Sequence, residues 1–470
     1  MRKSLAIVVQ MYLLLKGVPL AGANSEVLSP RDNDKTEELC EALLVVHPPL
    51  EFTRGGPILI TRQGEVFLSV NLNHQMGIFE MTNRRLRIFE SDASGRTDAS
   101  ARQGEADLFE SRSGRTYYGY LSSAGVKVFD ARRGSPILDL PFSHIPRLNG
   151  IQLEFGAPYS SLYKLLFFEE PTGGVHVALV PNNDSMFLDP AFTIPLVTIR
   201  LKDNFIAPGP RHLGIFRYLR LADRHLYAVG WERKDGGHPN TLLVHDLASR
   251  KDILRETFSH TQDPPIIIGQ LSLYLDARKQ PQLVMFLHGP NGKVLLFDRL
   301  ARSFVPLSGI ARTAIWGIQF FRDGRGFPWY AAAEGSESGR WTPDRFRLLV
   351  RPVDTDRGAI VRDLKMSDPE DEIHDVEVVE TPVGRLVLAW ERGFLRGQWT
   401  YKQLHIFNPS TGSLQVRQIP ENWRGIELNK SFFNPVSGLV MSYFFDKGIG
   451  MSALEFNANR DGPEGPPPGR

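Results

Sequence analysis

The chain of 470 residues contains a single cysteine, Cys40, so no disulfide bond can form within it. Small secreted domains usually depend on disulfides, whereas a chain of this length can bury enough apolar surface to fold without them. Three acidic residues, Glu37, Glu38 and Glu41, lie close to Cys40 and disfavour its thiolate form. We therefore expect the cysteine to have no catalytic role.

Motifs with spacing strict enough to identify an enzyme are also absent. The sequence has no GxSxG elbow, P-loop, HExxH motif, CxxC pair, EF-hand loop, or GxGxxG motif after a strand. Asp354 and Asp356 resemble the start of a calcium loop, but Lys365 stands where the bidentate glutamate should be. We expect no metal site and no cofactor, and whether the protein is an enzyme stays open.

Long apolar runs are missing as well, because no segment after the N-terminus could span a bilayer. Residues 1–23 have the pattern of an export signal: Arg2 and Lys3, an apolar stretch, and the small residues Ala21-Gly22-Ala23. The alternative, a membrane anchor, would need about 20 uninterrupted apolar residues. We expect cleavage and secretion, or a periplasmic location if the source is bacterial.

The chain lacks a strong charge of either sign. Its formal net charge is +2, and loss of Arg2, Lys3 and Lys16 with the signal leaves 52 basic residues against 53 acidic ones, or −1. No global field would then attract nucleic acid or anionic lipid. We expect neither as a partner.

Turn-forming residues, in contrast, are abundant, with 42 glycines and 33 prolines, and they separate short β-type runs. An apolar strand, often preceded by glycine, recurs at steps of 48 to 64 residues. Its copies are Gly150–Phe155, Gly214–Tyr218, Gly269–Leu273, Gly317–Phe321, Asp375–Val379 and Gly425–Leu428. A more hydrophobic strand follows each copy, for example Leu386–Trp390. Such repetition indicates a repeat architecture.

A third strand in each repeat closes on a turn-forming polar residue, as Val126–Asp130 and Leu242–Asp246 do, and most continue into a fourth. Weaker copies near Ile78 and within residues 182–189 complete a series of closing turns near 80, 130, 185, 246, 298, 354, 408 and 457. Each repeat is therefore predicted to be a four-stranded antiparallel meander, and the repeat length suits propeller blades.

These observations predict an all-β chain that forms a single closed β-propeller of eight blades over residues 42–458. The last repeat lacks a fourth strand, which Ala42–Val46 could supply, so that the ring has no open edge. Residues 24–41 are predicted to be a polar leader and 459–470 a disordered tail rich in proline and glycine. Seven blades are possible because the unit at 156–200 is degenerate, and a two-domain β-sandwich is the other alternative.

The turn Asn408-Pro-Ser-Thr-Gly412 resembles the repeat turns of the eight-bladed quinoprotein (PQQ-type) propellers, and Asp130-Ala-Arg-Arg-Gly134 is a looser version. This resemblance implies a propeller fold. Those repeats carry a docking tryptophan after the glycine, which this chain lacks, and the WD dipeptide of WD40 repeats does not occur either. The resemblance is to secreted β-propeller repeat proteins in general, without a specific family.

The loops that enter the innermost strands contain cations, imidazoles and indoles, which ring closure would gather at one mouth of the channel. Arginine offers bidentate donors and tryptophan a flat stacking face, so the set suits a small polar or anionic ligand or a glycan. The predicted ligand-binding residues are Arg147, Asn149, Arg211, His212, Arg312, Trp316, His374, Asp375, Trp423 and Arg424.

The sequence thus favours an exported, monomeric binding protein that recognises such a ligand or a protein partner through one face. The alternative is a secreted propeller enzyme, a hydrolase, lyase or oxidoreductase, in which His374 or His212 acts as general base. A purely structural role is the third possibility. Catalytic residues stay unassigned.

The signal assignment makes a direct prediction. Mass spectrometry of the exported protein should find an N-terminus near Asn24 and no disulfide, because Ala21-Gly22-Ala23 supplies the cleavage site. An exported fraction that still begins at Met1 would show that the segment is not a cleaved signal.

Overall fold

A computed structural model describes residues 44–46, 52–72, 75–80, 85–89, 106–122, 124–145, 163–181, 196–208, 214–232, 241–258, 270–287, 293–307, 314–335, 346–353, 359–382, 384–395, 398–419, 427–434, 438–446 and 450–457. All of them belong to one compact unit, Cys40–Arg470. The predicted signal, leader and tail lie entirely outside these ranges. Among the residues described, no helix is long and apolar enough to cross a membrane.

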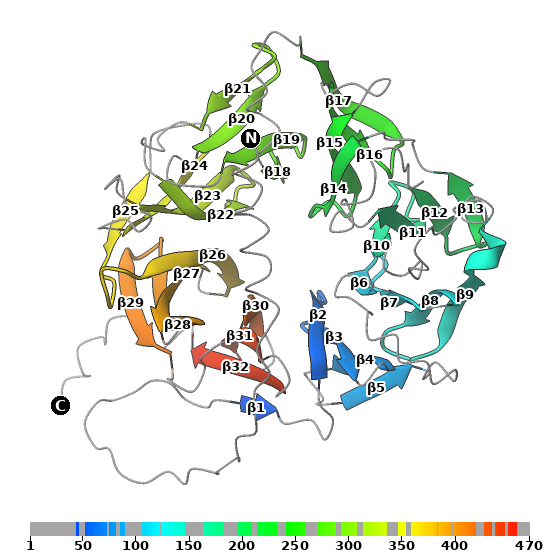
Figure 1. Ribbon diagram of the computed structural model, residues 1–470, viewed down its shortest axis with the longest axis horizontal. Coiled ribbons are helices and arrows are strands. Elements are labelled where there is room, and N and C mark those ends of the chain that lie inside the picture. The colour runs from blue at the N-terminus through cyan, green and yellow to red at the C-terminus, as the bar shows by residue number, and fades with distance from the viewer. Residues whose placement is uncertain are drawn as a thin grey trace, which may run out of the picture. The chain divides into compact units, whose positions relative to one another are not determined.

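Eight four-stranded antiparallel sheets form this unit, which we call blades 1 to 8 (Figure 1). Blade 1 contains β2 (Phe52–Ile60), β3 (Val66–Leu72), β4 (Gln75–Glu80) and β5 (Arg85–Phe89). Blade 2 contains β6 (Ala106–Glu110), β7 (Thr116–Leu121), β8 (Gly125–Asp130) and β9 (Pro136–Pro141), followed by the short helix η1 (Phe142–His144). Blade 3 contains β10 (Tyr163–Glu169), β11 (Val175–Pro181), β12 (Val197–Arg200) and β13 (Phe205–Pro208). Blade 4 contains β14 (Gly214–Arg220), β15 (Leu226–Glu232), β16 (Thr241–Asp246) and β17 (Lys251–Thr257).

The second half repeats the pattern. Blade 5 contains β18 (Gln270–Leu275), β19 (Pro281–Leu287), β20 (Lys293–Asp298) and β21 (Ser303–Pro306). Blade 6 contains β22 (Ala314–Arg322), β23 (Pro328–Gly335), β24 (Phe346–Pro352) and β25 (Ile360–Leu364). Blade 7 contains β26 (Glu372–Thr381), β27 (Gly384–Leu395), β28 (Gln398–Asn408) and β29 (Ser413–Gln418). Blade 8 contains β30 (Glu427–Asn434), β31 (Leu439–Asp446), β32 (Gly450–Asn457) and the first strand of the chain, β1 (Leu44–Val46).

Turn chemistry explains where the first strand of a blade ends. In blades 1 to 6 a turn of five residues joins the first strand to the second. Its first residue donates its N–H to the carbonyl of its fifth residue, and its fourth residue has a positive φ. This is a hairpin turn that needs one left-handed residue, and glycine fits it best because it has no Cβ. Blade 2 uses Gly114 (φ 81°), whereas blade 4 uses Arg224 (φ 69°). The arginine therefore occupies a backbone conformation that side chains disfavour.

The polar residue predicted to end the third strand is confirmed in several blades. Asp130 accepts hydrogen bonds from the backbone N–H groups of Arg132 and Arg133, and Asp298 caps the equivalent turn of blade 5 through the N–H groups two and three residues later. Asp246 and Asn408 act in the same way. A short carboxylate or amide side chain can bond the backbone two residues on, which is why these residues stop strands.

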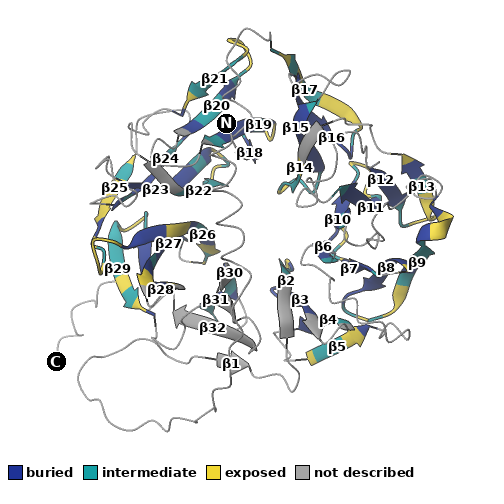
Figure 2. Cartoon of the chain, in the orientation of Figure 1, coloured by how far each residue is buried: buried dark blue, intermediate teal, exposed yellow. Residues whose placement is uncertain are grey.

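In blades 2, 3, 4, 6 and 7 the middle strands are largely buried, and the fourth strands are largely half-buried or exposed (Figure 2). All six residues of β7 and of β16 are buried, whereas β17, β25 and β29 are half-buried or exposed along most of their length. The hydrophobic sequence of the second and third strands follows from this burial.

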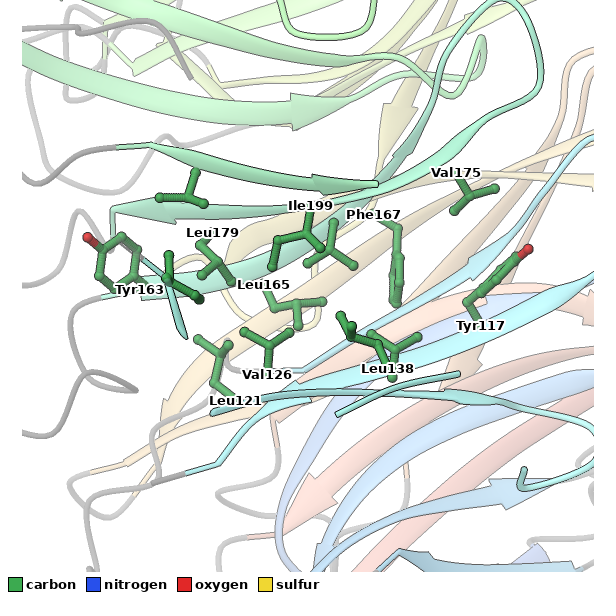
Figure 3. Packing of buried hydrophobic residues seen from close by; sticks show 14 of the residues in the cluster. Tyr117, Leu121, Val126, Leu138, Tyr163, Leu165, Phe167, Val175, Leu179 and Ile199 are labelled. Atoms are coloured by element: carbon green, nitrogen blue, oxygen red, sulfur yellow. The ribbon is translucent and has the colours of Figure 1, made fainter. Parts of the chain in front are cut away.

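Buried apolar side chains join each blade to the next, from blade 1 through blade 8. Between blades 2 and 3, Leu165, Phe167 and Leu179 pack with Val126 and Leu138 (Figure 3). Each such side chain contributes about 1.5–3 kcal/mol when fully buried. The interfaces between blades are therefore the core of the protein.

Side-chain acceptors on the first strands add hydrogen bonds between blades. Asp107 of blade 2 accepts the backbone N–H of Phe167 in blade 3, at 2.8 Å, and Gln319 of blade 6 accepts that of Val378 in blade 7, at 2.6 Å. Glu377 of blade 7 likewise accepts the N–H of Ser431 in blade 8. These side chains therefore connect the first strands of neighbouring blades, although each blade remains a separate sheet.

The predicted sharing of blade 8 by both ends of the folded chain is observed, because Leu44 of β1 lies opposite Ala453 of β32. Closure of the blades into a ring remains a prediction. The assignment of strands in blade 3 was wrong: its first strand is β10, not Gly150–Phe155, and its third strand is β12, not the segment near 185. Residues 182–189, which lie outside the described ranges, contain the Asn and Asp residues that imitated a closing turn.

The shared blade predicts that removal of all residues up to 48 lowers the melting temperature, because β32 then loses β1, one of its two partner strands. Each kcal/mol lost should lower it by roughly 2–4 °C for a large domain. Removal of all residues up to 40 keeps β1 and is the control. This form should melt like the protein that begins at residue 24. Equal melting of both truncated forms would show that β1 does not stabilise the fold.

Candidate functional site

Most of the predicted site residues fall outside the described part of the chain. These are Arg147, Asn149, Arg211, His212, Arg312, Trp423 and Arg424. Trp316 was expected in a loop, but its backbone lies within β22, and His374 and Asp375 lie within β26. Of the ten, only His374 and Asp375 have side chains that the structure describes, so blade 7 carries the site that can be analysed.

A β-bulge explains why two of these residues lie in strands. In β22 the pairing skips from Ile315 to Gly317, and in β26 it skips from Ile373 to Asp375, which leaves Trp316 and His374 as the extra residues. In β30 the same irregularity leaves Asn429. Bulges re-aim side chains and are frequent beside functional sites. Trp316 and His374 are thus at equivalent positions in consecutive blades, as their place before the repeats suggested, and Asn429 is a third that the sequence analysis missed.

His374 is exposed and lies beside an arginine. Its Nε2 is 3.4 Å from Nη1 of Arg392, and its ring is 6.0 Å from that of Tyr401. A guanidinium group can only donate, so the imidazole accepts through Nε2. Arg392 also donates to Glu372, at 2.8 Å, and its guanidinium carbon lies 4.5 Å from the centre of the Trp399 ring. One arginine therefore holds an imidazole, a carboxylate and an indole together.

Asp375, the next residue, has an unusual titration. The residue is exposed to solvent. Partial burial of the carboxyl and the neighbouring carboxylate of Glu377 nevertheless raise the pKa of Asp375 to about 6. The hydrogen bond from the N–H of Val376 lowers this pKa but does not outweigh them. Close to neutral pH this carboxyl therefore exchanges its proton, which a normal aspartate does not do.

The neighbouring hairpin carries two exposed aromatic side chains. Its strands β27 and β28, of 12 and 11 residues, are the longest among those described. Phe394 lies directly opposite Trp399 with the rings edge to face, 5.5 Å apart. Phe394 is 60% exposed and Trp399 40%. We call His374, Asp375, Arg392, Phe394 and Trp399 the blade 7 surface.

A packed ion pair supports the hairpin from the other side. Lys402 donates to Asp371 at 2.6 Å, and this pair crosses directly over Gly393. A Cβ at that position would lie 2.1 Å from Oδ1 of Asp371 and 2.3 Å from Cε of Lys402, so only glycine leaves room for the pair. The pair connects the hairpin to the segment that leads into β26.

Beneath the surface, Glu391 and His405 form a fully buried pair at 2.9 Å, and Ser367 donates to the same carboxylate. Burial alone would raise the pKa of Glu391, but the hydrogen bonds from His405 and Ser367 outweigh it and lower the pKa. The arrangement differs from a hydrolytic triad, in which the imidazole contacts the hydroxyl. Here the carboxylate lies between them, which suits structural support and not activation of Ser367. The described residues include no group of three His, Cys, Asp or Glu side chains placed to hold a metal ion.

Three members of the blade 7 surface, Arg392, Phe394 and Trp399, were not predicted. The sequence contains a signal for them, since Phe394 and Trp399 are placed symmetrically about Arg396-Gly397, and a glycine-containing pair is typical of a two-residue hairpin turn. Such a turn places the flanking aromatics opposite each other. The predicted residues all lie where the chain enters the first strand of a blade, whereas this hairpin joins the second strand of blade 7 to the third.

No protein-family model matches the chain, and no curated protein matches its sequence. Solved structures match it at low identity. The β-propeller domain of Cps50 (Swd1) from Myceliophteria thermophila is 11% identical with a TM-score of 0.41, covering 88% of this chain and 99% of that one. The WD40 domain of SCAP from fission yeast is 9% identical with a TM-score of 0.46, covering 89% and 98%. A virginiamycin B lyase from Staphylococcus aureus is 10% identical with a TM-score of 0.37, covering 88% and 98%. These are likenesses to β-propeller-type domains in general, and they carry no information about function.

The titration of Asp375 predicts a pH dependence of stability. Because the pKa in the folded state, about 6, is above the ordinary value of 3.8, the stability that this carboxyl contributes is fully present at low pH and is lost as the pH rises through 6. The Asp375→Asn variant should therefore gain melting temperature relative to the native protein between about pH 4 and pH 7. Asp139→Asn, which removes an exposed carboxylate from blade 2, is the control. A constant difference across this range would contradict the assignment.

Proposed function

We propose that the protein is an exported binding protein that contacts its partner through the blade 7 surface. The observation that carries the proposal is the exposed pair of Phe394 and Trp399 at the end of the longest hairpin. Aromatic side chains and arginine are enriched in protein interfaces, where they provide rigid contact area. Export rests on the signal pattern of residues 1–23 and places the partner outside the cytoplasm.

The surface is ordered before it binds, which favours recognition. Arg392 stacks on Trp399 and pairs with Glu372, and Lys402 anchors the base of the hairpin to Asp371. Side chains that are already fixed lose little conformational entropy on association. The hairpin can thus act as a preformed contact.

A binding role agrees better with the contacts of His374 than the enzyme alternative does. A general base needs a nitrogen that faces the substrate proton. The Nε2 of His374 faces Arg392 instead, and Ser367 is held by carboxylates. A propeller fold by itself decides nothing, since it hosts many functions.

The proposal predicts loss of binding in a protein that stays folded. The double variant Phe394→Ser, Trp399→Ser should lose about 1–2 kcal/mol of stability, because it removes the contact between the two rings and that of Trp399 with Arg392. On arrays of peptides, glycans and small acids, it should lose the signals that the native protein gives.

Phe205→Ser is the matched control, because Phe205 is 53% exposed on the fourth strand of blade 3. This variant should keep every signal. If the double variant binds the same array components as the native protein does, the partner contacts another part of the molecule.

A further inference from the structure

The charge around the blade 7 hairpin indicates the chemistry of its partner. Residues 367–377 and 391–402 together contain seven carboxylates and three Lys or Arg residues. The ion pairs Arg392–Glu372 and Lys402–Asp371 cancel two charges of each sign, and Glu391 is buried against His405. Asp368, Glu370, Asp375 and Glu377 then remain against one cation, Arg396, so the two segments carry a net negative charge.

The segment that carries these carboxylates is anchored to the hairpin. Glu372 pairs with Arg392, which stacks on Trp399. Asp371 pairs with Lys402 over Gly393, so both of these carboxylates already have a cation beside them. Asp368 and Glu370 are exposed in the same connecting segment, and Asp375 is exposed at the start of β26. Ser367, next to Asp368, donates to Glu391 of β27, which holds this segment against the hairpin. Interactions between exposed charges reach about 8 Å at physiological salt.

The aromatic pair adds a second attraction for cations. The face of an indole or phenyl ring attracts Lys and Arg side chains, and the 4.5 Å contact of Arg392 with Trp399 shows this interaction within the protein. The aliphatic part of a lysine or arginine side chain can pack on Phe394 while its charged end meets a carboxylate. Aromatic area and negative charge thus favour the same side chains.

We propose that the blade 7 surface binds a segment of a partner protein rich in lysine or arginine. This inference rests on the proposed function and specifies its partner. This partner differs from the small polar or anionic ligand or glycan expected from the sequence, because carboxylates outnumber Lys and Arg in the two segments around the surface. An open cross-strand pair with carboxylates spread around it suits an extended segment that makes several contacts. A second copy of the chain would bring the same negative charge to the hairpin, which opposes self-association.

The test uses the mature protein and fluorescein-labelled peptides of alternating glycine with lysine, glutamate or serine, followed by fluorescence anisotropy. The lysine peptide should bind, the other two should not, and added salt should weaken the binding. The triple variant Asp368→Asn, Glu370→Gln, Asp375→Asn should weaken it roughly tenfold, as should Phe394→Ala with Trp399→Ala. Asn at position 368 can still accept the hydrogen bond from the N–H of Glu370, so the turn should be kept.

A charge-matched control distinguishes this site from general attraction. The variant Asp139→Asn, Asp203→Asn, Glu380→Gln removes three exposed carboxylates, two in blades 2 and 3 and one at the end of β26 far from Glu372. It should bind the lysine peptide like the native protein. Equal weakening of both triple variants would overturn the proposal. Preference for the glutamate peptide, or self-association that Phe394→Ala abolishes, would also overturn it. One outcome separates the two proposals. If the native protein binds only glycans on the array and the double serine variant loses these signals, the proposed function stands and only the cationic partner is refuted.

Discussion

The packing of one blade against the next is the interaction on which the rest of the structure depends. A strand alternates its side chains between two faces, and Phe167 and Phe168 in β10 show the consequence. Both are almost completely buried, but Phe167 belongs to the cluster with blade 2 and Phe168 to the cluster with blade 4. A single blade would expose one of these faces, so no blade can be stable without its neighbours.

This constraint also limits where a partner can bind. Because the faces of the blades are used for packing, the strand ends, the hairpins and the fourth strands are what remains accessible. Blade 7 extends one hairpin further than the others described and fixes it with ion pairs at its base. The buried pair of Glu391 and His405 lies below it and connects β27 to β28. Support below and exposed aromatics above are what a binding surface on a rigid scaffold requires.

The sequence predicted the repeats well where turn chemistry is local. Asp130, Asp246 and Asn408 end strands because their side chains bond their own turns, and this can be recognised in a single chain. Blade 3 was misassigned because the Asn and Asp residues at 182–189 carry the same signal inside a longer connection. The repeat offset placed His374 and Trp316 at equivalent positions of two blades but could not show that bulges place them within strands. The role of Arg392 depends on contacts between strands, which one sequence does not contain.

Hydrogen–deuterium exchange of the mature protein, with and without the lysine peptide, tests the central claim most directly, because it locates the contact without any substitution. We predict that the peptide slows exchange in residues 391–402 and in the segment leading into β26, and leaves the equivalent hairpins of other blades unchanged. Protection spread over all blades, or confined to a blade other than blade 7, would contradict this account.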